Sequence, residues 1–170
     1  TFLVANQMDA TTYWASSSAP IGSAIKDASP EVESYCYLSG YYSNDIIRFN
    51  NKKVQSDKII EAQENFFDYF PYQFIEGSAK NALPDVNSIC LSQDLAVQIF
   101  GNQPALGKQI VLQGKNLIVR GVYKLDKKSV YNPSCVVNFI DARIKQTIQQ
   151  WGNFQFVLLK IAIRHLLFHL

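Results

Sequence analysis

Short apolar runs separated by turn-forming residues dominate the sequence, a pattern typical of strands rather than long helices. The runs are rich in β-branched and aromatic residues and are bounded by Gly, Pro, Asn and Ser. We predict strands at residues 1–6, 32–42, 89–91, 108–113, 116–123, 135–139 and 153–160, and a further pair around a turn at Asn50 and Asn51 within residues 45–63.

One strand pair reads as a hairpin with its turn at Gly114 and Lys115. Alternation gives each strand one apolar face, formed by Ile110, Leu112, Leu117 and Val119. Because these side chains should share one face, we expect the hairpin to cover a core.

Four segments show helical spacing of apolar residues, within residues 17–34, 64–74, 91–101 and 139–151. In the first, Pro20 suits the opening turn and Pro30 ends the helix. The second is a short aromatic helix that Pro71 terminates. Its aromatic side chains and the one that follows should cluster: Phe66, Phe67, Phe70 and Phe74.

The third helix has the clearest boundaries. Ser92 is a good N-cap, Asp94 complements the helix dipole, and Gly101 suits a left-handed αL position at the end. Its apolar face consists of Leu95, Ala96, Ile99 and Phe100. Together with the strands on either side, the first helix gives a β-α-β unit near the start of the chain.

Composition argues for one packed domain or two small ones. The chain has 170 residues, of which 48% are hydrophobic and 18% charged. Net charge is only +2, and the lysine pairs Lys52–Lys53 and Lys127–Lys128 sit in turn-like stretches. We therefore expect no nucleic-acid partner. No run of about 18 apolar residues occurs, so no segment is expected to span a membrane.

The cysteines are Cys36, Cys90 and Cys135, an odd number without C-x-x-C spacing. All lie in apolar, strand-like surroundings. The preferred interpretation is small buried hydrophobic residues; a disulfide or a reactive thiol is the alternative. The sequence predicts neither a metal site nor a cofactor.

Residues able to do chemistry are few. Glu61, Glu64 and Asp68 could share one face of a helix, and a solvated helix face explains them better than a catalytic cluster. Ser92 lacks a G-x-S-x-G elbow, so capping accounts for it. His165 and His169 are four residues apart but lack the glutamate of H-E-x-x-H, which favours an apolar tail over a zinc pair. We predict that the chain is not an enzyme.

The stretch FGNQPALGKQ, residues 100–109, resembles a phosphate-binding loop only superficially. Five residues separate Gly101 from Gly107, whereas a Walker A loop has four, and Gln109 replaces the required hydroxyl. A predicted helix precedes the loop and a strand follows it, which reverses the required order.

In order along the chain, several segments resemble the extracytoplasmic, or periplasmic core, domain of MacB-type and FtsX-like ABC transporter permeases. They are SAPIGSAIKDASPEV, NFFDYFPYQFIEG, ICLSQDLAVQIFGNQPALGKQI and LIVRGVYK. The residues that carry the motif are Phe66, Phe67, Gly77, Ser92, Ala96, Phe100, Gly101, Pro104, Gly107, Lys108 and Gly121. The similarity runs from about Thr1 to Lys160.

The resemblance implies structural roles for these residues, with the loop as a helix-to-hairpin junction. It also implies an α+β fold: a partial, porter-like β-α-β layer with an inserted mixed β-rich subdomain and short helices. The expected divisions are residues 1–42 for the first half of the layer, 43–150 for the inserted subdomain, and 151–170 for a return strand and a truncated apolar tail.

The resemblance further implies a non-catalytic domain on the extracytoplasmic face of the inner membrane, within a longer membrane protein. Such domains couple cytoplasmic ATP hydrolysis to export, lipoprotein extraction or partner activation by moving and docking. The implied partners are a cytoplasmic ABC ATPase, a periplasmic adaptor or carrier protein, and a second permease copy. A small-ligand sensor domain is the alternative, which a deep apolar pocket between the two parts would favour.

The loop comparison predicts that the chain does not bind Mg-ATP. Ligand at about 100 times its dissociation constant would stabilise the fold by about 2.7 kcal/mol, so binding would be visible as a higher melting temperature. We expect no change when Mg-ATP is titrated. A rise that Lys108→Ala removes would show that the loop binds phosphate.

Overall fold

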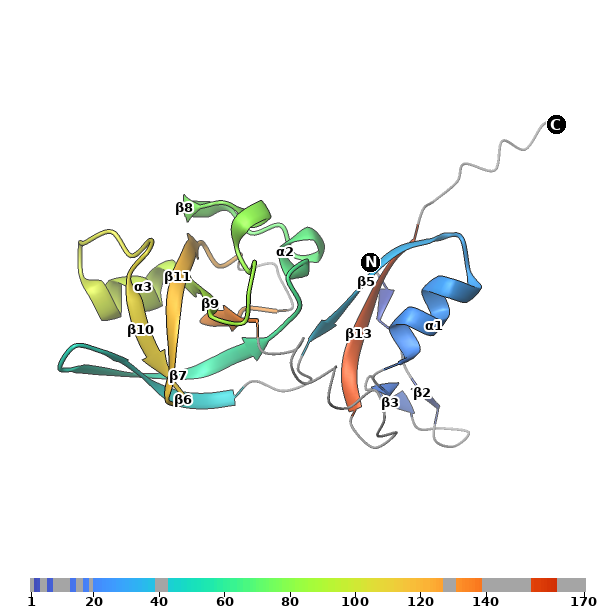
Figure 1. The fold of residues 1–170 in the computed structure, drawn as a ribbon, viewed down its shortest axis with the longest axis horizontal. Coiled ribbons are helices and arrows are strands. Elements are labelled where there is room, and N and C mark those ends of the chain that lie inside the picture. The colour runs from blue at the N-terminus through green and yellow to red at the C-terminus, as the bar shows by residue number, and fades with distance from the viewer. Residues whose placement is uncertain are drawn as a thin grey trace.

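The computed structural model describes residues 2–3, 6–7, 13–14, 17–18, 20–38, 43–126, 131–138 and 154–161. The helix expected at residues 139–151 and the tail with His165 and His169 lie outside these residues. Two separate sheets lie side by side along the long axis of the molecule (Figure 1). No helix among the described residues is both long and apolar enough to cross a membrane.

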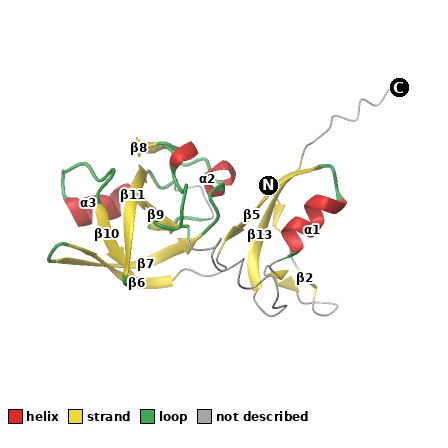
Figure 2. Cartoon of the chain, viewed as in Figure 1, coloured by secondary structure: helices red, strands yellow, loops and turns green. Residues whose placement is uncertain are grey.

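The first sheet is built around its last strand. β13 (Phe154–Ile161) pairs antiparallel with β5 (Val32–Leu38), β1 (Phe2–Leu3) and β4 (Ser17–Ser18). A separate small pair joins β2 (Asn6–Gln7) to β3 (Tyr13–Trp14). The β-α-β order predicted for the start of the chain is present, with α1 (Ile21–Ala28) beside the sheet (Figure 2).

The position of α1 depends on a glycine in its first turn. Gly22 is buried, and its N–H donates to the hydroxyl of Tyr37 on β5 at 2.9 Å. A Cβ at Gly22 would lie 2.7 Å from that hydroxyl oxygen. Any larger residue would require either the neighbouring tyrosine side chains or the helix to shift.

The second sheet closes on itself. Its strands are β6 (Ser43–Phe49), β7 (Lys52–Glu61), β8 (Phe74–Gly77), β9 (Ser88–Ser92), β10 (Gln109–Leu112), β11 (Lys115–Tyr123) and β12 (Cys135–Val137). The order is β10-β6-β7-β12-β9-β11-β8, and β11 also pairs with β10. Six strands thus form a closed ring, a small barrel, and β8 pairs with the far end of β11. Closure leaves these six strands without a free edge.

Apolar side chains fill the barrel. They come from every strand of the ring and form one buried cluster: Ile47, Ile59, Ile89, Leu91, Ile110, Leu112, Leu117, Val119, Val122, Cys135 and Val137. α3 (Gln93–Phe100) adds the face predicted from its spacing: Leu95, Ala96, Ile99 and Phe100. The predicted shared face of the β10–β11 hairpin is therefore confirmed.

A second, aromatic cluster covers the outer face of the central strands. Ile60, Cys90, Val136 and Tyr123 alternate with the barrel-filling residues and meet the short helix α2 (Phe66–Tyr69). The predicted aromatic cluster is present: the ring centroid of Phe67 lies 5.1 Å from that of Phe66 and 4.9 Å from that of Phe74. Phe70 stacks on Phe66 at 4.7 Å. A single 3-10 turn, η1 (Ala79–Asn81), follows β8.

The two sheets are joined through the residues that follow β7. The Ala62 N–H donates to the Val137 carbonyl on β12 at 2.9 Å, and Ala62 also forms a bridge with Leu38 on β5. The Gln63 N–H donates to the Tyr37 carbonyl at 3.1 Å, and the Tyr37 N–H donates to Gln63 Oε1 at 2.9 Å. We call residues 62–63 with Tyr37 and Leu38 the joint.

The structure corrects the interpretation of Glu61, Glu64 and Asp68 as one helix face. Glu61 is the last residue of β7 and is buried, whereas Asp68 lies in the single turn of α2. Pairing of β7 with β12 keeps this segment extended as far as the joint. Tertiary pairing has overridden the local helical spacing.

The hairpin turn is also one residue earlier than predicted. Leu112 pairs with Lys115, so the turn residues are Gln113 and Gly114, at φ 52° and 73°. Two consecutive positive φ values define the type of turn whose twist matches that of the flanking strands. Gln113 adopts the left-handed region without being a glycine.

We predict that Gln63→Ala loosens the joint. The substitution removes the acceptor for the Tyr37 N–H, and Tyr37 is only 2% exposed. Leaving a buried donor unpaired costs about 1 to 3 kcal/mol. Urea unfolding should show this loss, while Gln98→Ala on the exposed face of α3 stays within about 0.5 kcal/mol of the unaltered chain. Equal stabilities for the two variants would contradict the role of Gln63.

Candidate functional site

The sequence motif separates into three groups in the structure. Most of its residues lie along α3 and the loop that follows. Gly77 and Gly121 are cross-strand partners on β8 and β11. Phe66 and Phe67 are buried in the aromatic cluster. The motif therefore does not form a single pocket.

Ser92 is a helix cap. Its Oγ accepts a hydrogen bond from the Leu95 N–H at 3.3 Å, and the residue is 1% exposed. A hydroxyl so placed satisfies one of the free N–H groups of the first helical turn and is inaccessible to a substrate. Ala96, one turn along, packs into the barrel core.

Gly101 ends α3, but not in the αL conformation that its position suggested. Its φ is 65° and its ψ is −130°, whereas αL requires a positive ψ. The Gly101 N–H still donates to the Val97 carbonyl at 2.8 Å and so closes the helix. This backbone conformation is open to glycine but not to residues with a Cβ, so the demand for glycine is stricter than predicted.

Lys108 packs against two aromatic rings of the chain and does not serve as a phosphate ligand. Its Nζ lies 4.9 Å from the centroid of the Phe100 ring and 5.6 Å from that of Phe49, which is on β6. The same ammonium donates to Gln103 Oε1 at 2.7 Å. The two rings meet edge to face at 4.7 Å. Cation–π contacts thus hold together the end of α3, the loop and the β6–β7 hairpin.

A carboxylate already occupies backbone N–H groups of the loop. Glu76 Oε2 on β8 accepts from the Ala105 N–H at 2.9 Å and the Leu106 N–H at 2.8 Å. The Gly107 N–H donates to the Val119 carbonyl at 2.8 Å. These are the groups that a phosphate-binding loop would present to its ligand. The loop is therefore an internal anion site that the chain's own carboxylate fills.

Sequence reasoning did not find Glu76. It precedes Gly77 directly, but its partners are about 30 residues further along the chain. No local spacing signals that contact. Pro104, by contrast, is exposed, as its place in a turn suggests.

Gly77 and Gly121 permit a close approach between β8 and β11. A Cβ at Gly77, where φ is 75°, would lie 2.4 Å from the Arg120 carbonyl oxygen. One at Gly121 would lie 2.5 Å from the Phe74 ring. Both contacts are far below any tolerated distance. The glycines therefore fix β8, and with it Glu76, against the barrel.

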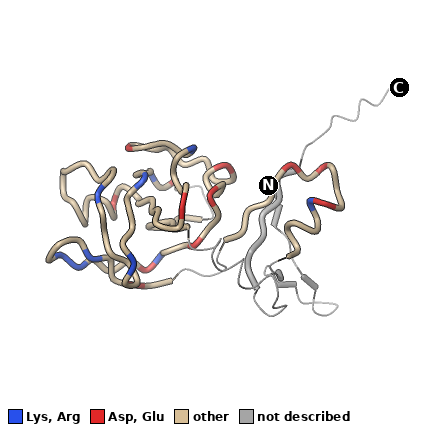
Figure 3. Tube along the Cα trace, in the orientation of Figure 1, with Lys and Arg blue, Asp and Glu red and all other residues tan. Residues whose placement is uncertain are grey.

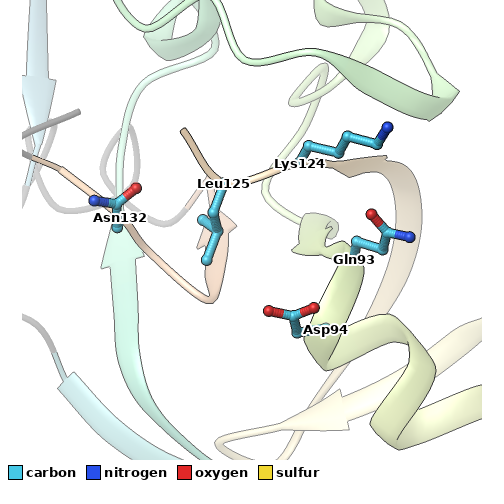
Figure 4. Close-up of a pocket in the computed structure, with 5 residues that line it drawn as sticks. All are labelled: Gln93, Asp94, Lys124, Leu125 and Asn132. Carbon is cyan, nitrogen blue, oxygen red and sulfur yellow. The ribbon is translucent and has the colours of Figure 1, made fainter. Parts of the chain in front are cut away.

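Three open grooves lie on the described surface. Figure 4 shows one of about 390 Å³, with Gln93 and Asp94 at the start of α3 facing Asn132 across Leu125. A groove of about 710 Å³ contains the Asp85–Arg120 ion pair, whose atoms are 3.3 Å apart.

The third groove, about 220 Å³, lies at the joint between the sheets. Its lining is polar apart from one tyrosine: Lys26, Ser34, Tyr35, Gln63, Glu64 and Asn65. Each of the three grooves has only one carboxylate, so none supplies a pair of carboxylates for general acid–base work. Within the described residues, no group of three or more His, Cys, Asp or Glu side chains could hold a metal ion.

The cysteines are buried and unreactive by environment. Cys36, Cys90 and Cys135 are free thiols with no exposed surface. Burial disfavours the thiolate, which raises the pKa of Cys135 to about 12 and that of Cys90 above its ordinary range. The interpretation as small buried hydrophobic residues is confirmed.

Comparison with known proteins identifies the fold. The sequence matches the family model described as MacB-like periplasmic core domain over residues 2–163. No curated protein sequence matches the chain.

Similar solved structures include three domains of transport proteins. A domain of a permease protein from Porphyromonas gingivalis has a TM-score of 0.73 at 19% identity, over 89% of this chain and 71% of that one. The periplasmic region of MacB from Actinobacillus actinomycetemcomitans has a TM-score of 0.60 at 15% identity, over 84% of this chain and 64% of that one. The extracellular domain of the ABC-type transporter YknZ from Gram-positive bacteria has a TM-score of 0.62 at 15% identity, over 94% of this chain and 81% of that one.

We predict that Gly77→Ala is far more destabilising than Gly114→Ala. Both glycines have positive φ, 75° and 73°, but a Cβ at Gly114 meets nothing within 4 Å. The backbone strain alone costs about 1 to 2 kcal/mol, and the clash at Gly77 adds about 1 to 3 kcal/mol. Urea unfolding of both variants measures the difference. Equal losses would contradict the steric argument.

Proposed function

Because the chain belongs to the family of MacB-like periplasmic core domains, we propose that it is the part of an ABC transporter permease that performs mechanical work outside the membrane. The family and the similar structures make it a periplasmic domain of such a permease. The work we propose is the export of cargo, the extraction of lipoproteins or the activation of a partner protein. ATP hydrolysis by a cytoplasmic ABC ATPase would drive it.

The observation that carries this proposal is the joint. Ala62 bonds to β12 in the barrel and bridges to β5 in the first sheet, and Gln63 bonds twice to Tyr37. The aromatic cluster also includes Cys36 and Leu38 of β5. Displacing the first sheet would therefore displace the barrel with it, as a domain that transmits force requires.

The placement of the outer strands supports the same function. β1 and β13 are hydrogen-bonded neighbours, with Phe2 opposite Leu159. Both lie in the first sheet, at one end of the molecule (Figure 1). Two membrane segments connected there would be held close together and would act on the first sheet directly. We propose residues 1–42 and 151–170 as this membrane-proximal layer and 43–150 as the inserted subdomain.

The groove between the two parts does not favour the alternative of a small-ligand sensor. The groove at the joint is polar and, at about 220 Å³, smaller than typical ligand pockets of about 300 to 1,000 Å³. A force-transmitting domain needs partner surfaces instead of a pocket. The partners we propose are the cytoplasmic ATPase, a second permease copy and a periplasmic adaptor or carrier protein.

The proposal predicts the architecture of the parent protein. Its gene should encode apolar runs of about 20 residues on both sides of this domain. The full-length protein should fractionate with the inner membrane, and externally added protease should cut the domain in spheroplasts. It should also co-purify with an ABC ATPase. A gene product without membrane spans, or a domain that only cytoplasmic protease reaches, would overturn the proposal.

A further inference from the structure

One end of the barrel carries an uncompensated positive surface. Residues 46–56 and 95–114 contain Arg48, Lys52, Lys53 and Lys108 as their only charged residues. The remaining chain carries twelve Lys and Arg against all fourteen Asp and Glu. We call these four side chains the distal basic surface. Figure 3 shows its hairpin part at the tip of β6 and β7.

The four cations lie at the same end of the barrel, around the β6–β7 hairpin. Lys108 lies over the Phe49 ring at 5.6 Å, and Lys52 is the cross-strand partner of Phe49. Arg48 is adjacent in sequence and pairs directly with Lys53. Arg48, Lys52 and Lys53 are exposed and Lys108 is half-buried. Because side chains alternate between the two faces along a strand, Arg48 and Lys53 lie on the opposite face of the hairpin from Phe49, Lys52 and Lys108. The four charges therefore lie on the two faces of one hairpin tip.

This arrangement is unfavourable for the fold alone. Directly opposed like charges on adjacent strands repel, and a carboxylate at either Arg48 or Lys53 would turn that repulsion into attraction. The turn residues between the two strands, Asn50 and Asn51, carry no charge that could neutralise the cations. A surface that keeps such repulsion is suited to meeting an opposite charge from outside.

We propose that the distal basic surface docks an acidic surface of another protein. The choice of a protein over an anionic lipid rests on the proposed function. β1 and β13, which would connect to the membrane part, lie at the opposite end of the molecule from the β6–β7 hairpin (Figure 1). The surface therefore faces away from that membrane. Exposed Ile46, on the same strand as Arg48, offers an apolar contact beside the charges.

The experiment uses a fluorescein-labelled decaglutamate peptide as the acidic probe and the full chain at low ionic strength. Lys53→Glu should weaken binding at least about fivefold, whereas Lys80→Glu, which makes the same change of net charge at an exposed site on η1, should have little effect. Raising the salt to about 0.15 M should weaken binding by the unaltered chain.

Thermal unfolding separates binding from folding. Lys53→Glu places an opposite charge across from Arg48, so its melting temperature should equal or exceed that of the unaltered chain while its binding falls. A melting temperature of Lys53→Glu well below that of the unaltered chain would show that Lys53 stabilises the fold, and it would overturn the assignment of Lys53 to a docking surface.

Two further outcomes would overturn the proposal. Equal effects of Lys53→Glu and Lys80→Glu would mean that the peptide recognises only the net charge of the chain. No binding of the peptide would mean that the surface does not recognise acidic protein. Binding to vesicles of phosphatidylglycerol and phosphatidylcholine in equal parts, lost in Lys53→Glu, would make the partner a lipid surface if the peptide did not bind. Failure of the proposed function would appear instead as a parent gene without membrane spans, which leaves the peptide result unchanged.

Discussion

The structure depends on the burial of both faces of the central strands. In β9, Ile89 and Leu91 face the barrel core while Cys90 faces the aromatic cluster, and β12 repeats the pattern with Val136. These strands are thus the shared wall of two hydrophobic cores. A substitution that changes the packing of one core should also change the packing of the other, because closely packed interiors relax only partly. The joint lies where the same wall ends, at Val137.

The loop after α3 shows how an apparent ligand site can be complete within the chain. Its N–H groups converge as they would around a phosphate, but Glu76 supplies the anion. Hydrogen bonds to a charged group contribute about 1.5 to 3 kcal/mol each, so an external anion would have to displace a strong internal one. Gly77 makes this possible by letting β8 approach β11 closely. The same loop positions Lys108 against Phe49 and Phe100.

The proposed function depends on where these parts lie in the fold. The joint ties the barrel to the sheet that contains β1 and β13, and the distal basic surface lies at the far end of the barrel. Under the proposed function, a movement that enters at one end would reach a partner at the other. The barrel between them has a closed ring and a filled interior, both of which resist deformation.

The sequence alone determined the elements that depend on local chemistry. The cap at Ser92, the apolar face of α3, the Pro71 stop and the aromatic cluster follow from propensity and spacing, which act between near neighbours. It also indicated the family, because the motif glycines and Phe100 occur in a fixed order. Only the tertiary structure decided the rest. Glu61 is a strand residue because β12 pairs with β7, and Glu76 is a loop anchor because β8 packs beside residues about 30 positions away. Contacts between distant segments leave no periodic signal in the sequence, so the joint, the closed barrel and the contact of Lys108 with Phe49 became visible only in the folded chain.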